Sequence, residues 1–175
     1  KSGNLFIPLD TDSGAALALY AFFEKIYYYE KRVLIESPLA WPRNVGLFKS
    51  IEGMRAESEN NAAYLGAPYN EYIIFPYSNA NLTAISFNKG VLGHEHFHAH
   101  FGHLVNDHLV ELKSASNFDV EVSLDCPMTG LQYELYLLRS WNEGLADFYG
   151  AVTSGHPKFA KASIIMEFAQ HRDVD

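Results

Sequence analysis

Gly93-His94-Glu95-His96-Phe97-His98 is the stretch around which the chain is organised, because it holds a histidine pair with a glutamate directly after the first histidine. Residues four positions apart lie on one face of an α-helix, so His94 and His98 can bind one metal ion together. Glu95 would then stand beside that ion, where a carboxylate can act as general base toward a metal-activated water.

A third ligand is expected from a second helix, predicted over residues 131–152. A catalytic zinc ion takes three protein ligands and keeps one position open. Glu143 is the candidate ligand in this helix, and Asp147, one turn further on, can accept the free ring N–H of a ligand histidine. A later histidine in the first helix is the alternative, but the required position is Leu104, which cannot ligate. The two stretches therefore predict one Zn²⁺ site.

The first helix carries further histidines on its far side, namely His96, His100 and His103. Two interpretations are open: a second metal site, or a solvated polar face. We favour the solvated face, because no carboxylate is placed with these histidines.

Hydrophobic periodicity and turn residues predict an α+β protein with a single domain spanning residues 1–175. Asn88 is a favourable N-cap for the first metal-binding helix, which should reach about Glu111. The apolar stripe of the second should contain Leu131, Leu135, Leu138, Leu145 and Phe148. The other expected elements are a helix over 14–33, strands over 5–9, 45–56 and 72–77, a loop or insertion over 113–130 and a helical stretch over 157–170.

Composition limits the classes of partner. Of the 175 residues, 48% are hydrophobic and 14% aromatic, enough for a packed core. The formal charge of −8 argues against nucleic acid, since a phosphate backbone requires a basic face. The most apolar run, Ala15 to Phe23, is too short to span a membrane. The first residues, Lys1-Ser2-Gly3-Asn4, are typical of a processed or trimmed chain, so we expect a secreted or periplasmic protein.

With both helices in place, the chain resembles the gluzincin zinc metallopeptidases, and within them the thermolysin-like branch. Asn142-Glu143-Gly144-Leu145-Ala146-Asp147 is similar to that branch's Asn-Glu-x-x-x-Asp block. Asn60-Asn61-Ala62-Ala63-Tyr64 resembles its Asn-Asn-Ala-Phe-Trp segment. The aminopeptidase-like gluzincins are the runner-up, but their exopeptidase motif has no counterpart in this chain.

The resemblance implies a zincin-like fold, in which a small antiparallel or mixed sheet packs on long active-site helices. It also implies that the edge strand of this sheet binds a peptide or protein substrate, with Asn61 contributing its side-chain amide and Ala62 its carbonyl. Val91 would line the pocket for the residue after the scissile bond, and Ile85 is a weaker candidate for the same wall.

The chain departs from the branch in three places. Lys89-Gly90 stands where a calcium-binding aspartate is common, so we predict no calcium there. The interval from His98 to Glu143 is longer than usual. In that branch a helical C-terminal lobe carries an Asp/His pair for the oxyanion, and we expect this lobe to be absent or truncated here. By the resemblance, Tyr133 or Tyr136 could take over as oxyanion donor.

The expected function is zinc-dependent hydrolysis of peptide bonds by a metal-activated water, with Glu95 as general base and with endopeptidase specificity. One alternative is a catalytically inactive metal-binding module, or a fragment of a larger metallopeptidase. Another is a structural zinc site closed by a fourth ligand such as His100 or Asp147.

Overall fold

The fold of the chain is described by a computed structural model for residues 11–33, 39–47, 61–66, 69–74, 84–105 and 130–163. The strand expected over 5–9 lies outside these ranges, as does the loop expected over 113–130 except for Gly130, which begins a helix. Three α-helices and one small mixed sheet account for most of the described residues, which confirms the coarse α+β prediction.

The sheet contains three short strands in the order β1-β3-β2. They are β1 (Asn44–Leu47), β2 (Ala62–Leu65) and β3 (Glu71–Ile74), with β1 parallel and β2 antiparallel to the central β3. Within the described residues β2 is therefore an edge strand, at the position that the sequence predicts for substrate binding.

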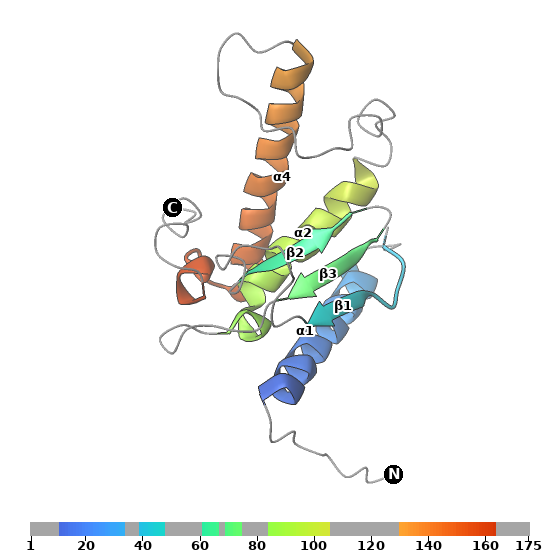
Figure 1. Ribbon diagram of the computed structural model, residues 1–175, viewed down its shortest axis with the longest axis vertical. Helices are drawn as coiled ribbons and strands as arrows, with labels where there is room; N and C mark the ends of the chain where they lie inside the picture. The colour runs from blue at the N-terminus through green and yellow to red at the C-terminus, as the bar shows by residue number, and fades with distance from the viewer. Residues whose placement is uncertain are drawn as a thin grey trace, which may run out of the picture.

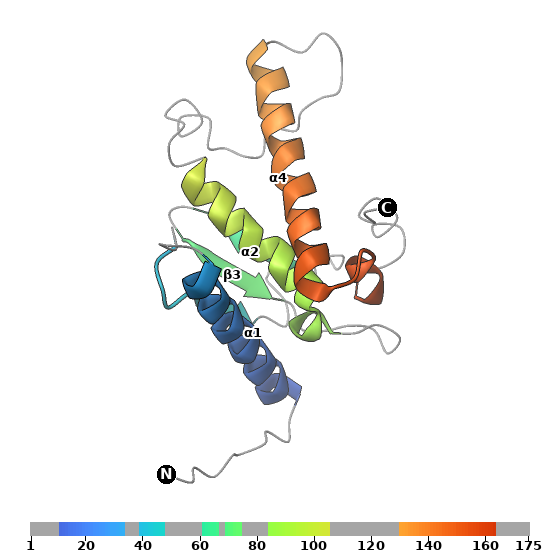
Figure 2. The same ribbon diagram turned by 180° about the vertical axis from the view of Figure 1, so that it is seen from behind.

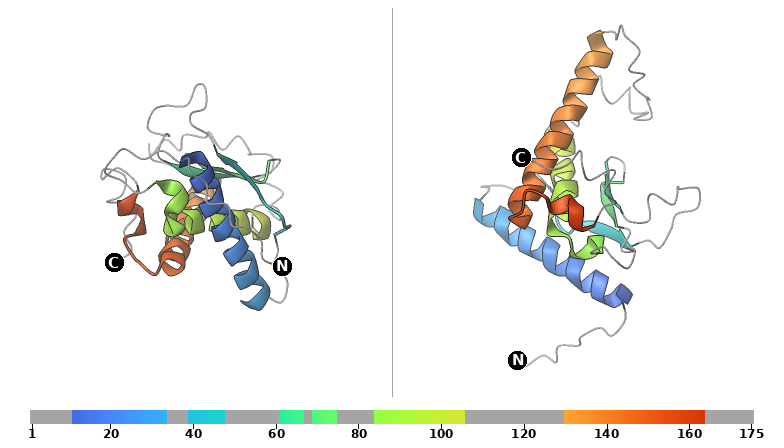
Figure 3. Two further views of the ribbon diagram at one scale, coloured as in Figure 1. Left: turned by 90° about the horizontal axis from the view of Figure 1, so that it is seen from below. Right: turned by 90° about the vertical axis from the view of Figure 1, so that its left-hand side faces the viewer.

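Long helices lie behind this sheet (Figure 1). They are α1 (Thr11–Val33) and α2 (Lys89–Leu104), and both are seen in front of the strands when the molecule is turned round (Figure 2). The third, α4 (Gly130–Ser154), runs beside α2 and projects beyond it (Figures 1 and 3). Side chains from α1, α2, β3 and the short 3₁₀ helix η2 (Ile85–Phe87) form the core.

The start of α2 is fixed by Asn88, as predicted. Its side-chain oxygen accepts hydrogen bonds from the N–H groups of Gly90 and Val91, at 3.0 and 3.2 Å. Its amide nitrogen donates to the Phe159 carbonyl and the Ser163 hydroxyl, both at 2.8 Å. Asn88 thus caps α2 and also ties it to the segment that follows α4.

Glycines allow α2 and α4 to approach closely. A Cβ atom on Gly150 would lie 2.6 Å from the carbonyl oxygen of Gly90, and one on Gly93 would lie 2.9 Å from the Cβ of Thr153. Gly93 directly precedes His94, so this close packing brings α4 against the first ligand histidine.

The predicted apolar stripe of α4 is wrong in its central part. Leu145 and Phe148 are 48% and 59% exposed, whereas Ala146 and Gly150 on the opposite side are buried. Contact with α2 decides which face is buried, and small side chains beside the two carboxylates allow that contact.

The region after α4 also differs from the prediction of a helix over 157–170. Its described part contains only turns and the 3₁₀ helix η4 (Phe159–Ala162). The ring of Phe159 fills the space beside Gly90 and Gly150. Packing of this ring against the two helices, rather than helical periodicity, determines the course of the chain here.

Candidate metal centre

Helices α2 and α4 bring the predicted metal ligands together. The Nε2 atoms of His94 and His98 lie 3.0 Å apart. Glu143 reaches across from α4, with one carboxylate oxygen 3.4 Å from His94 Nε2 and the other 3.7 Å from His98 Nε2. His94 is buried, whereas Glu143 is 44% exposed. The three predicted ligands therefore converge on one point, with buried His94 on one side and the exposed carboxylate of Glu143 on the other.

The other ring nitrogens of these histidines face oxygen atoms on α4. His94 Nδ1 lies 2.8 Å from Asp147 Oδ1, a contact that is electrostatic in character because the two atoms are not aligned as a hydrogen bond. His98 Nδ1 lies 2.9 Å from the side-chain oxygen of Asn142. Both oxygens are acceptors, so each contact favours a ring tautomer with the proton on Nδ1.

This choice of tautomer determines what the site can hold. With the protons on Nδ1, the two Nε2 atoms present lone pairs to one another and to the carboxylate of Glu143. A positive charge is needed to satisfy three converging acceptors. Tetrahedral zinc, with bonds of about 2.0–2.2 Å, places its ligand atoms roughly 3.3 Å apart. The observed separations lie around that value, so these residues fit a metal ion.

Glu95 stands beside the histidine pair but is held by a different element. Its carboxylate and the ligand atoms of His94 and His98 lie within 4.8 Å of one another. One carboxylate oxygen accepts a hydrogen bond of 2.9 Å from the backbone N–H of Tyr64 in β2. Glu95 is only 6% exposed. The two carboxylates therefore differ in surroundings: Glu143 reaches both Nε2 atoms from the exposed side, while Glu95 is buried and anchored to the edge strand.

The predicted substrate-binding residues occupy two different environments. Asn61 is exposed, and its side-chain oxygen accepts the N–H of Ala62 at 2.9 Å. Since the Tyr64 N–H points to Glu95 and not to β3, alternation along the strand places the Ala62 carbonyl on the same outer edge. Val91 and Ile85 are buried in the hydrophobic core.

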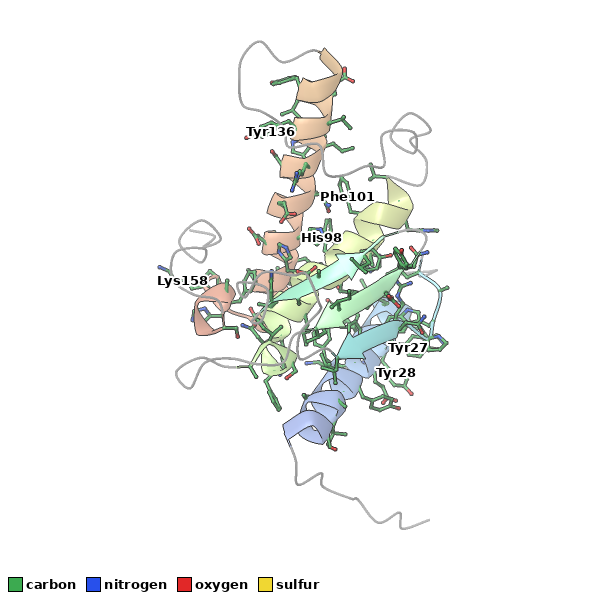
Figure 4. All side chains as sticks on the ribbon, viewed as in Figure 1. Tyr27, Tyr28, His98, Phe101, Tyr136 and Lys158 are labelled. Atoms are coloured by element: carbon green, nitrogen blue, oxygen red, sulfur yellow. The ribbon has the colours of Figure 1, made fainter. Side chains whose placement is uncertain are left out.

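The structure does not bring the predicted oxyanion donors to the metal ligands. Tyr136 and Tyr133 are 42% and 55% exposed and lie on the projecting part of α4. Tyr136 precedes Glu143 by about two helical turns, or roughly 10 Å. Figure 4 shows Tyr136 on the upper part of α4, well above His98 of α2 in this view.

A second cluster of ionisable side chains lies on another face of α2, where the sequence predicted a solvated polar surface. That prediction is wrong for His96 and His100. His96 is completely buried and its Nε2 lies 2.5 Å from Glu30 Oε1. His100 is 12% exposed, and its Nε2 lies 2.7 Å from the same oxygen. Only His103 of the stripe is exposed. The carboxylate that the helix itself lacks is supplied by α1.

Further polar groups surround this second cluster. The Trp41 indole N–H donates to Glu30 Oε2 at 3.2 Å, and the Tyr72 hydroxyl lies 2.8 Å from His96 Nδ1. Burial lowers the pKa of His96, although Glu30 acts in the opposite direction. Burial, assisted by Glu30, raises the pKa of Tyr149 to about 12. The cluster therefore consists of one buried carboxylate with imidazole, indole and hydroxyl groups around it.

Three residues of these two clusters were not assigned a role from sequence. Asn142 belongs to the Asn-Glu-x-x-x-Asp block, so its position was visible but its contact with His98 was not. The anchor on Glu95 is a backbone N–H, which leaves no signal in residue type. Glu30 lies 66 residues before His96, and no local pattern connects them.

Comparisons with known proteins found no match: no family model, no curated protein and no solved structure matches the chain. Among the described residues, no helix is both long and apolar enough to cross a membrane.

Proposed function

We propose that the chain is a zinc-dependent peptidase of zincin-like fold, with Zn²⁺ held by His94, His98 and Glu143. The observation that carries the proposal is the convergence of two Nε2 atoms and one carboxylate, next to a second carboxylate that is anchored to an edge strand. A purely structural site would not need this second, separately anchored carboxylate.

The roles of the residues follow from their surroundings. Zinc, when bound, would polarise the scissile carbonyl and make an attacking water more acidic. Glu95 takes the proton of that water and passes it to the leaving amine. Asp147 and Asn142 keep the proton of each ligand histidine on Nδ1.

Substrate binding is proposed at the edge of β2. An extended peptide can add to an exposed edge strand through main-chain hydrogen bonds. The Ala62 carbonyl is available to accept from such a peptide, and the Asn61 amide can donate to it. Because Tyr64 links the same strand to Glu95, a peptide bound at this edge would lie beside the general base.

The test is the substitution Glu95→Gln, assayed for zinc content and for casein cleavage. We expect zinc to remain near one equivalent at the first site while cleavage is lost. Glu134→Gln, at an exposed position of α4, is the matched control and should behave as the unmodified protein. Cleavage at the normal rate by the Glu95→Gln protein would refute the proposal.

A second candidate is a metal-binding module without catalytic activity. It is favoured by one observation: the two tyrosines that could stabilise an oxyanion, Tyr133 and Tyr136, are exposed and about two or more turns from Glu143. Zinc binding without any cleavage of casein would select this candidate.

A further inference from the structure

The first metal centre uses one histidine pair of α2, and the cluster of Glu30, His96 and His100 uses another. The donor types are the same in both: two histidines four apart and a glutamate from a different helix. In each cluster the Nε2 atoms of both histidines point to that glutamate, and Nδ1 of the first histidine faces a further polar group. The two clusters are therefore similar both in their ligand atoms and in having a polar group at Nδ1 of the first histidine.

We propose that Glu30, His96 and His100 form a second site for a divalent cation of borderline softness such as Zn²⁺, separate from the proposed catalytic centre. Two imidazoles and a carboxylate are a recognised ligand set for zinc. All three ligand atoms lie within 4.8 Å of one another. The carboxylate comes from α1 and the histidines from α2, so a bound ion would crosslink these two helices.

The separations show which state of the site the structure represents. His96 and His100 approach Glu30 Oε1 to 2.5 and 2.7 Å, which are hydrogen-bonding distances. An ion needs ligand atoms roughly 3.3 Å apart, so Glu30 would have to withdraw by roughly 0.7 Å. The second site is therefore closed by protons and must open to bind, which predicts weaker binding than at the first site.

When the second site opens, the ring protons of its histidines can be carried on Nδ1 instead of Nε2. Each imidazole must carry its proton on Nδ1 in order to present an Nε2 lone pair. For His96 this N–H would donate to the Tyr72 hydroxyl, which can accept as well as donate. His100, at 12% exposed, is the ligand nearest to solvent and the natural point of entry.

The burial of the cluster decides the role of the ion. Glu30 and His96 are 3% and 0% exposed, so a substrate molecule cannot reach the site. We therefore assign the second ion to stabilisation of the α1–α2 packing and not to hydrolysis.

The test is a zinc titration of the full chain with the first site disabled. The double variant His98→Ala/Glu143→Ala removes two ligands of the first site at positions that are not deeply buried. We expect two zinc equivalents in the unmodified protein, the second weaker, and one in the double variant. Zinc should also raise the Tm of the double variant.

Adding His100→Gln to the double variant should abolish the remaining zinc and the Tm increase. Glutamine keeps an N–H donor for Glu30, so the fold should survive, which circular dichroism would verify. His103→Gln, in the same background, is the matched control: His103 is exposed on the same helix, and its substitution should change neither readout.

The outcomes separate the two sites. A folded double variant that binds no zinc would overturn the second site and show that Glu30 only forms hydrogen bonds, whatever the first site does. Retention of a single zinc equivalent in both the unmodified protein and the double variant would support the second site and contradict the proposed catalytic centre.

Discussion

Two faces of α2 carry histidine pairs of the same spacing, and yet the pairs are in different states. On one face, His94 and His98 hold their Nε2 atoms apart from Glu143 by 3.4 and 3.7 Å. On the other, His96 and His100 touch Glu30 at 2.5 and 2.7 Å. The glutamate and the histidines alone cannot explain this difference, because both faces have them.

The two histidine pairs differ in the groups that contact Nδ1 of their imidazole rings. Asp147 and Asn142 place acceptor oxygens against Nδ1, which favours the tautomer whose Nε2 carries no proton and is suited to a cation. The Tyr72 hydroxyl behind His96 can donate, which allows Nε2 to keep its proton and to donate to Glu30. The group at Nδ1 thus decides whether an i, i+4 histidine pair is ready for a metal ion or closed by hydrogen bonds.

The largest expected contrast between the faces is in stability. Glu30→Ala leaves the buried donors of His96, His100 and Trp41 without their acceptor, so it should lower the free energy of unfolding by about 3–5 kcal/mol. Glu143→Ala, at a 44% exposed side chain, should change it by less than about 0.5 kcal/mol.

Urea unfolding of both variants in a chelator would measure this contrast without any contribution from bound metal. Equal destabilisation by the two substitutions would contradict the assignment of Glu30 to the buried network.

Metal affinity should show the next largest contrast. Asp147→Ala removes the acceptor behind His94 and should weaken zinc binding at the first site about 10–100-fold. Competition with a chelating indicator would measure this, with Glu134→Ala on the exposed side of α4 as control. An unchanged affinity would mean that Asp147 does not control the proton of His94.

The link between β2 and Glu95 can be tested through turnover. Tyr64→Pro removes the backbone N–H that holds Glu95 while β2 stays an edge strand, where proline is tolerated. We expect kcat for peptide cleavage to fall roughly tenfold with zinc retained, as for loss of one hydrogen bond to a charged group.

Tyr64→Ala keeps the N–H and is the matched control for the loss of the ring. If both variants lost activity equally, the side chain and not the backbone contact would be responsible.

The smallest effect is expected from removing the Tyr72 hydroxyl, which contacts Nδ1 of His96. Tyr72→Phe removes the hydroxyl at Nδ1 of this histidine and should cost about 1 kcal/mol of stability, measured by urea unfolding. Zinc affinity at the first site should not change, because that face of α2 has its own partners. A change in that affinity would show that the two faces are coupled through the helix.

The predictions that succeeded from sequence depend on short-range geometry. The pairing of His94 with His98 follows from helical periodicity, and the N-cap at Asn88 from the ability of its side chain to accept backbone N–H groups. The α+β class was also predicted, from local periodicity and turn residues. The position of β2 at a sheet edge was implied only by the resemblance, because it depends on pairing between segments that are far apart in the chain.

The predictions that failed depend on which element packs against which. Phe148 is more hydrophobic than Ala146, and yet Ala146 is buried, because α2 approaches the face of α4 that carries small residues and carboxylates. His96 and His100 were expected in solvent because nothing in the sequence connects them to Glu30. The hydrophobicity and charge of its residues do not by themselves determine which face of a helix packs against a neighbouring element.

The sequence by itself determined the spacing of the ligands and the helix face on which each histidine lies, because a helix turn is a local and regular structure. The tertiary structure alone decided which oxygen or hydroxyl stands behind each imidazole. That partner sets the position of the ring proton, and the proton decides whether the histidine presents a lone pair or an N–H. One helix can therefore carry two similar histidine pairs that differ in their readiness for metal.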